Sequence, residues 1–360
     1  MQEETSKDKV SSRHIRSFVD IIRRLLHGSR LFIDEGAIVE VLINPASGLL
    51  KTGLAHNKMM RHLHRLAAAR SSAQTPRPGL EIRFHETRSS SHAGEKAVEL
   101  VGSLAASPKP GHRVLILAGG DGFYNDILGA LLRDVPDIMK DICLFRLPMG
   151  TGNDNADAAS VEEALAILCN ASGFHKDSII TIQTARNKLH YAFNVASFGL
   201  DAYVCLLTNK MKKLAGPTVI YKIFANVAVL MYEWIWPLQQ WKIDIYTEEG
   251  IVNREGRFLL NVFGRKGPTR YGGGMKVLPG DENYLLIDPL SLLEKLRLKP
   301  LFYRGAHRGV PFAKLYKTDK ITLHHQGPVL IQLDGEVTRL EVEDFPVTIQ
   351  KEADILNILQ

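Results

Sequence analysis

Glycine and aspartate gather in a short segment, AGGDG, at residues 118–122. The apolar run Val114–Leu117 before it predicts a buried strand, and apolar residues keep helical spacing from Tyr124 to Leu132 behind it. A glycine turn between a strand and a helix lets backbone N–H groups approach an anion, and the helix N-terminus favours phosphate. Asp121 lies inside this turn, where a carboxylate that faces polyphosphate needs a bound cation or a proton to accept.

A second glycine turn follows the next apolar run, Ile142–Leu147, in the segment LPMGTGNDNADA at residues 147–158. Either turn alone is consistent with an ordinary connection from a strand to a helix. Neither has the spacing of a Walker A loop or of GxGxxG. Two such turns after successive strands favour phosphate binding over simple chain reversal.

Hydroxyl and amide side chains follow two further expected strands. The strand Ile38–Ile43 runs into NPASG, where Asn44 and Ser47 can form hydrogen bonds with a nucleotide. Thr87 opens a hydroxyl-rich loop after the strand Leu80–Phe84. A lone NPxSG would be only a turn, so these residues gain weight from the two glycine turns.

An acidic turn, LDGE at residues 333–336, ends another apolar strand. Asp334 and Glu336 supply the kind of carboxylate that can accept the proton of an attacking hydroxyl during phosphoryl transfer. A DGE turn by itself is also consistent with an ordinary hairpin tip.

Six motifs occur in the order seen in the diacylglycerol kinase catalytic-domain family, which includes bacterial lipid kinases, eukaryotic diacylglycerol kinases and sphingosine kinases. The resemblance covers roughly residues 37–350 and is greatest to the compact bacterial members. The motifs are NPASG (44–48), GGDG (119–122) with Asn125 and Asp126 behind it, LPMGTGND (147–154), SFGLDA (197–202), GGGMKVLP (272–279) and LDGE (333–336).

The resemblance implies that ATP and Mg²⁺ are the cofactors and that the γ-phosphate passes to the hydroxyl of a diacylglycerol-like lipid, giving phosphatidic acid. Glu336 is the implied general base, as in bacterial members, and Asp334 lies beside it. Asp121 is the alternative base, because sphingosine kinases use the aspartate of GGDG. The implied nucleotide contacts are Asn44, Ser47, Thr87, Gly119, Gly120, Asp121, Gly122, Asn125, Gly150, Thr151, Asn153 and Asp154.

Two departures from the family pattern bear on activity. Phe123 stands where the family has a threonine whose hydroxyl contacts phosphate, and the loss of one such bond costs roughly 1.5 to 3 kcal/mol. The loop that binds a structural magnesium in bacterial relatives is shortened to PGDENYLLI, with Glu282 and Asn283 where aspartate and glycine are expected. Asp281 and Glu282 are the remaining candidate metal ligands, and the altered loop puts this metal site in doubt.

Strand, loop and helix alternate from residue 38 to 170, which predicts an α/β domain with a parallel sheet. Strands separated by turns follow Gly173, with one long helical stretch at 206–236, and predict a mainly β second domain. By resemblance, the fold is NAD kinase/diacylglycerol kinase-like, with the active site in the cleft between the domains. The expected strands of the second domain are 178–184, 189–197, 241–247, 257–263, 284–288, 320–324 and 328–333.

The expected domain limits are 1–36 for an N-terminal extension, 37–172 for the nucleotide-binding domain and 173–344 for the lipid-substrate domain, with 345–360 returning to the first. In the extension, apolar residues at helical spacing from Ile15 to Leu26 alternate with arginines. This helix either docks on the body or contacts a membrane or partner.

The net charge of +6 over 360 residues indicates an anionic partner. We expect no nucleic-acid binding, because no basic motif is interleaved with aromatic residues. Anionic lipid headgroups at a membrane surface are the expected partner, and the oligomeric state, including a homodimer, stays open. The basic residues that could face such headgroups are Lys210, Lys212, Lys213, Arg297, Lys299, Arg304 and Arg308.

A cytoplasmic protein, peripheral to the membrane, is expected. The hydrophilic start does not resemble a signal peptide, and three widely spaced cysteines predict neither a disulfide framework nor a zinc site. The longest apolar stretch, Thr218–Leu238, contains Lys222, Asn226 and Glu233, which argues against a membrane-spanning helix.

Three alternatives to a diacylglycerol kinase remain. Phe123 and the altered 279–284 loop would suit a non-catalytic relative that binds nucleotide or lipid. A sphingoid-base kinase would need an acidic residue near the ammonium group, where this chain has Tyr203, although Asp201 lies close by. NAD kinases share a GGDG turn, but the added NPASG, GTGND and DGE segments disfavour that reading.

Overall fold

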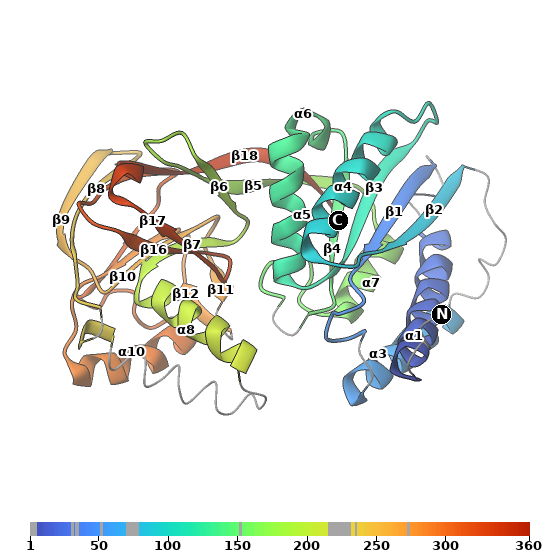
Figure 1. The fold of residues 1–360 in the computed structure, drawn as a ribbon, viewed down its shortest axis with the longest axis horizontal. Helices are drawn as coiled ribbons and strands as arrows, with labels where there is room; N and C mark the ends of the chain where they lie inside the picture. The colour runs from blue at the N-terminus through green and yellow to red at the C-terminus, as the bar shows by residue number, and fades with distance from the viewer. Residues whose placement is uncertain are drawn as a thin grey trace. The chain divides into compact units, whose positions relative to one another are not determined.

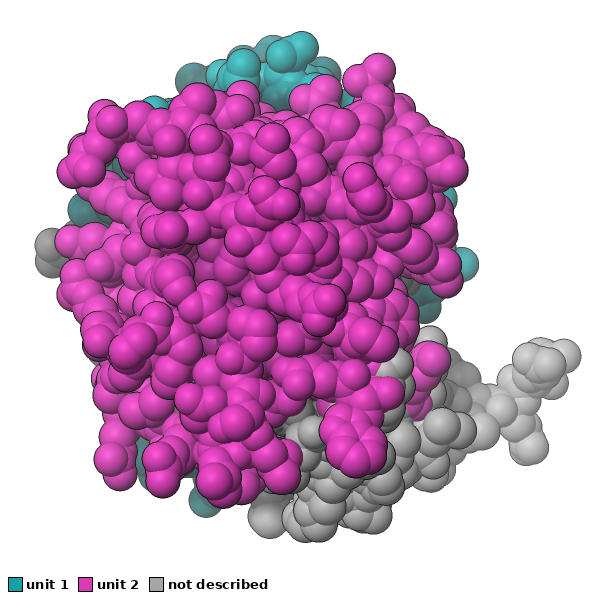
Figure 2. Space-filling model, turned by 90° about the vertical axis from the view of Figure 1, so that its left-hand side faces the viewer, with its two compact units in different colours: residues 1–177, 354–360 teal, residues 178–353 magenta. Residues whose placement is uncertain are grey.

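The computed structural model describes residues 6–29, 32, 36–50, 53–69, 79–150, 153–214, 232–234, 236–271 and 274–360 (Figure 1). They form two compact units, coloured separately in Figure 2: unit 1 is residues 1–177 with 354–360, and unit 2 is residues 178–353. These limits lie five and nine residues beyond the boundaries at 172 and 345 predicted from the sequence. The difference arises because strands β5 (Phe174–Gln183) and β18 (Val347–Leu359) each run from one unit into the other.

Unit 1 contains a parallel sheet in the order β2-β1-β3-β4, and residues of β18 pair in parallel with β4. Its strands are β1 (Ala37–Ile43), β2 (Leu80–Glu86), β3 (His112–Gly119) and β4 (Cys143–Pro148). All seven residues of β1 are buried, as expected of a parallel strand covered on both faces. The sheet therefore brings the carboxyl ends of β1, β3 and β4, and the motifs that follow them, to one edge.

Helices cover both faces of this sheet. Helices α1 (Ser6–His27), α3 (Leu54–Ala69) and α7 (Val161–Asn170) share a hydrophobic core with alternate residues of β1. Helices α4 (Ser90–Ala105) and α5 (Asp121–Asp134) pack against each other and against β3, and the short α6 (Pro136–Met139) follows. In α1, Phe18, Ile22 and Leu26 are fully buried, so the docked position is the one the structure supports for this amphipathic helix.

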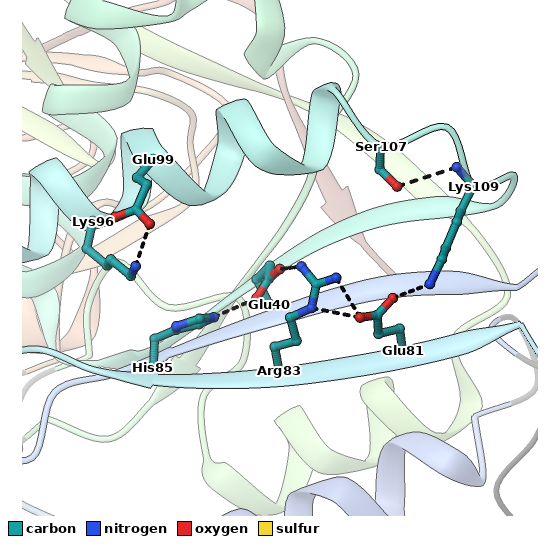
Figure 3. A network of polar contacts seen from close by, with 8 residues as sticks. All are labelled: Glu40, Glu81, Arg83, His85, Lys96, Glu99, Ser107 and Lys109. Atoms are coloured by element: carbon teal, nitrogen blue, oxygen red, sulfur yellow. Dashed lines mark hydrogen bonds and ion pairs between the residues drawn. The ribbon is translucent and has the colours of Figure 1, made fainter.

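A buried carboxylate interrupts the apolar run of β1. Glu40 accepts a hydrogen bond from Arg83 at 2.9 Å, and His85 Nε2 lies 2.7 Å from its other oxygen (Figure 3). Glu81 continues the network, bound by Arg83 and by Lys109 at 2.6 Å. Buried charge is tolerated only when it is paired, as Glu40 is here. The strand β2 lies at the end of the sheet order, and its charged side chains disfavour pairing with another strand.

Unit 2 is mainly antiparallel. One sheet has the order β14-β13-β10-β7-β16-β17, with strands β7 (Val195–Gly199), β10 (Leu260–Gly264), β13 (Tyr284–Ile287), β14 (Ala313–Tyr316), β16 (Val329–Leu333) and β17 (Glu336–Leu340). Phe198, Phe263 and Tyr284 of this sheet share a core with Trp241 and Ile243.

The second sheet of unit 2 supplies those last two residues. Residues 347–350 of β18 pair with β15 (Lys320–His324), and β15 is followed in the sheet by β8 (Gln240–Thr247) and β9 (Gly250–Arg257). β5 pairs with β18 and with β6 (Leu189–Ala192). The remaining elements are α8 (Leu200–Leu214), β11 (Thr269–Tyr271), β12 (Met275–Leu278), α10 (Leu292–Arg304) and the 3₁₀ turn η2 (Val342–Asp344).

The α/β domain followed by a mainly β domain confirms the predicted fold class. The single strand predicted at 189–197 is wrong: it divides into β6 and β7, because the backbone N–H groups of residues 193–195 donate to a side chain and not to a neighbouring strand. The helix predicted at 206–236 begins earlier, as α8, and residues 215–231 lie outside the described residues. Within the described part of the chain, no helix has both the length and the apolar character needed to cross a membrane.

Candidate functional site

The two glycine turns of unit 1 touch each other at the carboxyl ends of β3 and β4. Met149 N–H donates to the Gly119 carbonyl at 2.7 Å, and Gly120 is the N-cap of α5. A Cβ atom added to Gly150 would lie only 2.7 Å from Gly120 Cα. Glycine is therefore required here, and the pair forms a surface of bare backbone at a helix N-terminus, which is suited to phosphate.

Asp121 ties the two turns together. Its Oδ2 accepts the backbone N–H groups of Asn153 at 2.9 Å and Asp154 at 3.1 Å, and its Oδ1 accepts that of Asn155 at 2.9 Å. The carboxylate lies in the first turn of α5, where the helix stabilises negative charge. Asp121 therefore positions the second turn, and most of its capacity for hydrogen bonds is used within the protein.

Two asparagines complete the second turn. Asn153 adopts a left-handed backbone conformation with φ of 70°, and its side chain bonds both the N–H of Gly150 at 2.8 Å and its carbonyl at 3.1 Å. Asn155 donates to Asn125 of α5 at 2.9 Å and accepts from Arg146 at 2.9 Å. Asn125 thus helps to join α5 to the second turn. Thr151, which was predicted to contact the nucleotide, lies outside the described residues.

Arg146 anchors this arrangement from inside β4. It is fully buried, binds Asp157 through its side chain and its backbone N–H, and lies 3.8 Å from Asp177. The charge is compensated by these carboxylates, as buried arginine requires. Arg146 and Asp157 were not predicted as site residues from the sequence. The arginine in the middle of the apolar run CLFRLP could have indicated them.

Asn44, Ser47 and Thr87 gather at the same edge of the sheet. Asn44 N–H donates to Ala118 O at 3.0 Å, directly before the first glycine turn, and Thr87 donates its N–H and its hydroxyl to Ile43 O at 2.9 and 3.3 Å. Ser47 is buried, and its hydroxyl has no hydrogen-bond partner among the described residues. Ligands of parallel α/β sheets bind outside the carboxyl ends of the strands, so this hydroxyl lies at the edge where such a sheet binds its ligand.

Phe123 does not project into solvent. Its side chain is buried, and a Cβ atom added to Gly119 would lie 2.1 Å from the Phe123 ring. The neighbouring Tyr124 hydroxyl lies 2.8 Å from Gly119 O and 2.5 Å from Leu147 O, and burial raises the pKa of this tyrosine. The Phe123 ring therefore packs against the first glycine turn. Two other predicted nucleotide contacts, Gly122 and Asp154, are exposed.

In unit 2, Asp334 and Gly335 form a two-residue turn between β16 and β17, with φ values of 50° and 91°. Aspartate followed by glycine suits such a turn, because both positions are left-handed. Asp334 accepts the backbone N–H groups of Phe193 at 2.5 Å, Asn194 at 2.9 Å and Val195 at 2.8 Å. Burial raises the pKa of Asp334 to about 6.

Glu336 begins β17 and is exposed. Its carboxylate has no hydrogen-bond or ion-pair partner in the part of the chain that the structure describes. The hairpin thus carries two carboxylates in different surroundings. Backbone amides engage Asp334, whereas Glu336 can still accept a proton or a hydrogen bond.

A buried polar cluster lies on α8 and the adjoining strands of unit 2. Asp201 accepts hydrogen bonds from the Ser197 hydroxyl at 2.6 Å, the Tyr271 hydroxyl at 3.0 Å and the Gln332 amide at 3.4 Å. Burial raises the pKa of Asp201. Tyr203, two residues further along α8, packs beside Tyr232 with ring centroids 5.3 Å apart.

Comparison with known proteins identifies part of this chain. Residues 39–182, which contain both glycine turns, match the sequence profile of the diacylglycerol kinase catalytic domain. Over these residues the chain is similar to the diacylglycerol kinase catalytic domain. The curated diacylglycerol kinase of Staphylococcus saprophyticus is 25% identical to the chain over 255 residues, which are 69% of this chain and 78% of that relative.

Solved structures extend the similarity of fold beyond residues 39–182. A crystal structure of a diacylglycerol kinase from Bacillus anthracis strain Sterne has a TM-score of 0.56 and 13% identity. A second structure from that strain, of a candidate diacylglycerol kinase, has a TM-score of 0.58 and 14% identity. Each alignment covers 91% of this chain and 97% of the other, so both compact units share their fold with these structures.

The two predicted metal ligands, Asp281 and Glu282, are not arranged around a metal. Asp281 is exposed, and Glu282 binds Arg308 at 2.6 Å. Asn283, where the family has glycine, is buried and bonds Gly264 O at 3.1 Å and Thr318 O at 2.7 Å. The described residues include no group of three or more histidine, cysteine or acidic side chains placed to hold a metal ion. This loop therefore does not fit a structural magnesium.

Proposed function

We propose that this protein is an ATP-dependent lipid kinase that transfers the γ-phosphate to the hydroxyl of a diacylglycerol-like lipid, giving phosphatidic acid. One observation carries the proposal: Asp121 holds two glycine turns in contact at the N-terminus of α5, inside a domain that matches the diacylglycerol kinase catalytic domain. Bare backbone at a helix N-terminus is an anion-binding surface. The turns would therefore hold the nucleotide phosphates.

Unit 1 supplies the nucleotide-binding residues in this proposal. Gly120 and Gly150 give the phosphates close access to the backbone, and Asn44, Ser47 and Thr87 line the same edge of the sheet. Magnesium usually keeps several waters and binds one or two carboxylates together with substrate phosphates. Such an ion would neutralise phosphate charge. Because three backbone amides already engage Asp121, the nucleotide phosphates would supply most of the oxygen ligands of that ion other than water.

Unit 2 supplies the general base. Glu336 is the better candidate, because its exposed carboxylate has no partner among the described residues, whereas Asp334 accepts three backbone N–H groups. A positioned base that takes the hydroxyl proton typically contributes a factor of about 10² to 10⁴ in rate.

A neutral headgroup is the favoured acceptor. An ammonium group needs an ionised carboxylate beside it, but burial raises the pKa of Asp201, and three side-chain donors already occupy this residue. Tyr203, which follows in α8, is buried in an aromatic cluster. These features support a diacylglycerol-like alcohol over a sphingoid base.

The test is transfer of labelled γ-phosphate from ATP, with magnesium, to diacylglycerol, ceramide, sphingosine and monoacylglycerol in mixed micelles. We expect diacylglycerol to be labelled, and Glu336→Gln to lower the rate by about 10² to 10⁴ while leaving the unfolding transition unchanged. The control is Glu248→Gln, an exposed glutamate of unit 2, which should keep the rate. Full activity in Glu336→Gln would move the base to Asp121, and ATP binding without any labelled lipid would reject the kinase.

That last outcome would support a second candidate, a relative that binds nucleotide or lipid without transferring phosphate. Phe123 is the observation that favours it, because its buried ring packs against Gly119 where the family has a hydroxyl for phosphate.

A further inference from the structure

Unit 2 exposes a group of large apolar side chains along and beside α10, the helix at the lower edge of this unit in Figure 1. We call it the α10 patch. It consists of Trp234 (88% exposed), Leu292 (56%), Leu293 (67%), Leu296 (54%) and Tyr303 (46%). Single exposed leucines are normal, but five large apolar side chains exposed on and beside one helix indicate an interaction site.

The helical spacing explains why these side chains face outward together. Lys295 and Phe302, seven residues apart, form the inner side of α10; both are buried, and Phe302 packs in a core with Val277 and Leu278. Leu292, Leu296 and Tyr303 repeat at four and seven residues on another side, which places them in one row. The inner side is already occupied, so the exposed row is free to meet a partner.

Trp234 is held beside this row by two anchors. Glu233 forms an ion pair of 3.0 Å with Lys295 of α10, whose side chain is only 4% exposed. The residue before Glu233, Tyr232, is buried against Tyr203. The backbone on one side of Trp234 is thus fixed, and the exposure of the indole does not come from a free chain end.

Basic residues flank the apolar row. Leu293, Arg297 and Arg304 follow each other at helical spacing, and both arginines are exposed. Neither forms an ion pair within the described part of the chain. Glu294, which attracts Arg297 weakly from the same helix, is engaged in the capping box of Ser291 at 2.7 Å, and Arg308 is paired with Glu282. The charge left for a partner around the α10 patch is therefore positive.

We infer that the α10 patch is a docking surface for a lipid bilayer that contains anionic lipids. Leucine side chains would enter the boundary of the acyl chains, tryptophan and tyrosine suit the headgroup layer, and Arg297 and Arg304 would meet lipid phosphates. The positive flank selects an anionic surface over a neutral one. This docking does not depend on phosphate transfer, so it goes beyond the proposed kinase activity.

The first test is sedimentation of the full chain with vesicles, in the absence of ATP and diacylglycerol. Vesicles of an equal mixture of phosphatidylcholine and phosphatidylglycerol should bind the protein, and phosphatidylcholine alone should bind it more weakly. Exchanging Leu292, Leu293 and Leu296 together for glutamine should weaken binding by about 100-fold, since a buried leucine contributes roughly tenfold or less in such a surface. Ile251→Gln and Leu189→Gln, exposed apolar residues elsewhere in unit 2, are the matched controls and should bind normally.

Charge gives a second, independent arm. The pair Arg297→Gln and Arg304→Gln should weaken binding to the anionic vesicles by about tenfold or more and leave binding to phosphatidylcholine unchanged. Arg257→Gln, an exposed arginine of β9, is the matched control. Equal loss on both kinds of vesicle would contradict an electrostatic contact with anionic lipid.

Tryptophan fluorescence reports the contact directly. Of the three tryptophans, Trp241 is buried in the core and Trp236 is partly buried, so Trp234 should dominate any change on binding. Anionic vesicles should shift the emission to the blue, and Trp234→Phe should abolish that shift while the protein still sediments.

Three results would overturn the inference: normal vesicle binding by the triple leucine variant, an unchanged Trp234 emission on vesicles, or a wild-type dimer in vesicle-free buffer that the triple variant converts to a monomer. The last would assign the patch to a second copy of the chain. Loss of docking with intact phosphorylation of micellar lipid would reject only this surface, and docking without any lipid phosphorylation would reject only the kinase.

Discussion

Each compact unit contains an aspartate whose carboxylate accepts three successive backbone N–H groups. In unit 1, Asp121 binds the amides of residues 153–155, and in unit 2, Asp334 binds those of residues 193–195. Their surroundings differ. Asp121 lies in the first turn of a helix, beside bare glycine backbone, whereas Asp334 lies in a two-residue hairpin turn where burial raises its pKa to about 6.

The comparison separates structural from chemical roles in motifs that look catalytic. Both aspartates stand in sequence motifs that suggest chemistry, yet both use their oxygens to hold a loop. What they hold differs: Asp121 keeps a phosphate-type turn open at the surface, and Asp334 fixes the strand start beside the hairpin that presents Glu336. In unit 1 the backbone proposed to bind phosphate lies next to the aspartate, and in unit 2 the carboxylate proposed to react, Glu336, lies next to it.

The largest expected effect is that of Asp334→Ala. Three backbone donors would lose their acceptor, and the raised pKa shows that water has little access to this carboxyl. We therefore expect the free energy of unfolding to fall by about 4 to 5 kcal/mol. Urea unfolding measures this loss. Asp319→Ala, an exposed aspartate of the same unit paired with Lys351, should change stability by only about 0.5 kcal/mol. Equal losses in the two variants would show that the three amides do not depend on Asp334.

The raised pKa of Asp334 predicts a pH dependence of stability. The unfolded chain releases this proton near pH 3.9, but the folded protein holds it up to a pH of about 6. The stabilisation from the bound proton is complete below about pH 4 and is lost as pH rises to 6, by up to about 3 kcal/mol. Urea unfolding across this range should show the decline in the wild type and a flatter profile in Asp334→Asn. If stability changes with pH equally in the wild type and in Asp334→Asn, the titrating group is not Asp334.

Asp121→Ala should destabilise less, by about 2 to 3 kcal/mol, because the site is partly exposed and water can replace the lost acceptor. The substitution should weaken ATP affinity more than it lowers the free energy of unfolding, because residues 153–155 would no longer be held against the first glycine turn. ATP binding by calorimetry, beside urea unfolding, tests this. Asp134→Ala, at the exposed end of the same helix, is the control. Unchanged ATP affinity would show that residues 153–155 do not contribute to nucleotide binding.

The smallest expected change in stability is that of Phe123→Thr. Removal of a buried ring that packs against Gly119 should cost about 2 kcal/mol in unfolding free energy. The added hydroxyl should raise the rate of phosphate transfer by about tenfold, the value of one hydrogen bond to a charged group. Both quantities are measured on the same preparation. A slower variant would mean that the ring itself shapes the active turn.

Much of the fold was predictable because it depends on local patterns. Apolar runs followed by glycine or asparagine turns gave the strands of unit 1, and parallel order then places their carboxyl ends, with Asn44, Gly120 and Gly150, at one edge. The weaker parts lack such a pattern. β9 carries charged residues and is largely exposed, and α10 has Pro300 inside it and exposed leucines, so neither shows a clear apolar period.

The hydrogen bonds of the site could not be predicted in the same way. Asp121 and its amides are more than thirty residues apart, and Asp334 is about 140 residues from its own. Asp201 meets Tyr271 and Gln332 only through sheet pairing and helix docking. Contacts at these separations depend on how elements pack, and no spacing within the sequence records them.

The strand β18 bears on how the kinase domain could be isolated. Its residues Asn357 and Ile358 pair with Cys143 and Leu144 of β4, and Leu359 belongs to the core of unit 1. A fragment limited to the matched residues 39–182 would leave the outer edge of β4 without its neighbour, and open strand edges promote aggregation. Such a fragment would also lose helix α1, whose buried residues belong to the same core. Excision at those limits would therefore give an insoluble piece unless α1 were kept and residues 354–360 were joined back to it, as in a permuted chain.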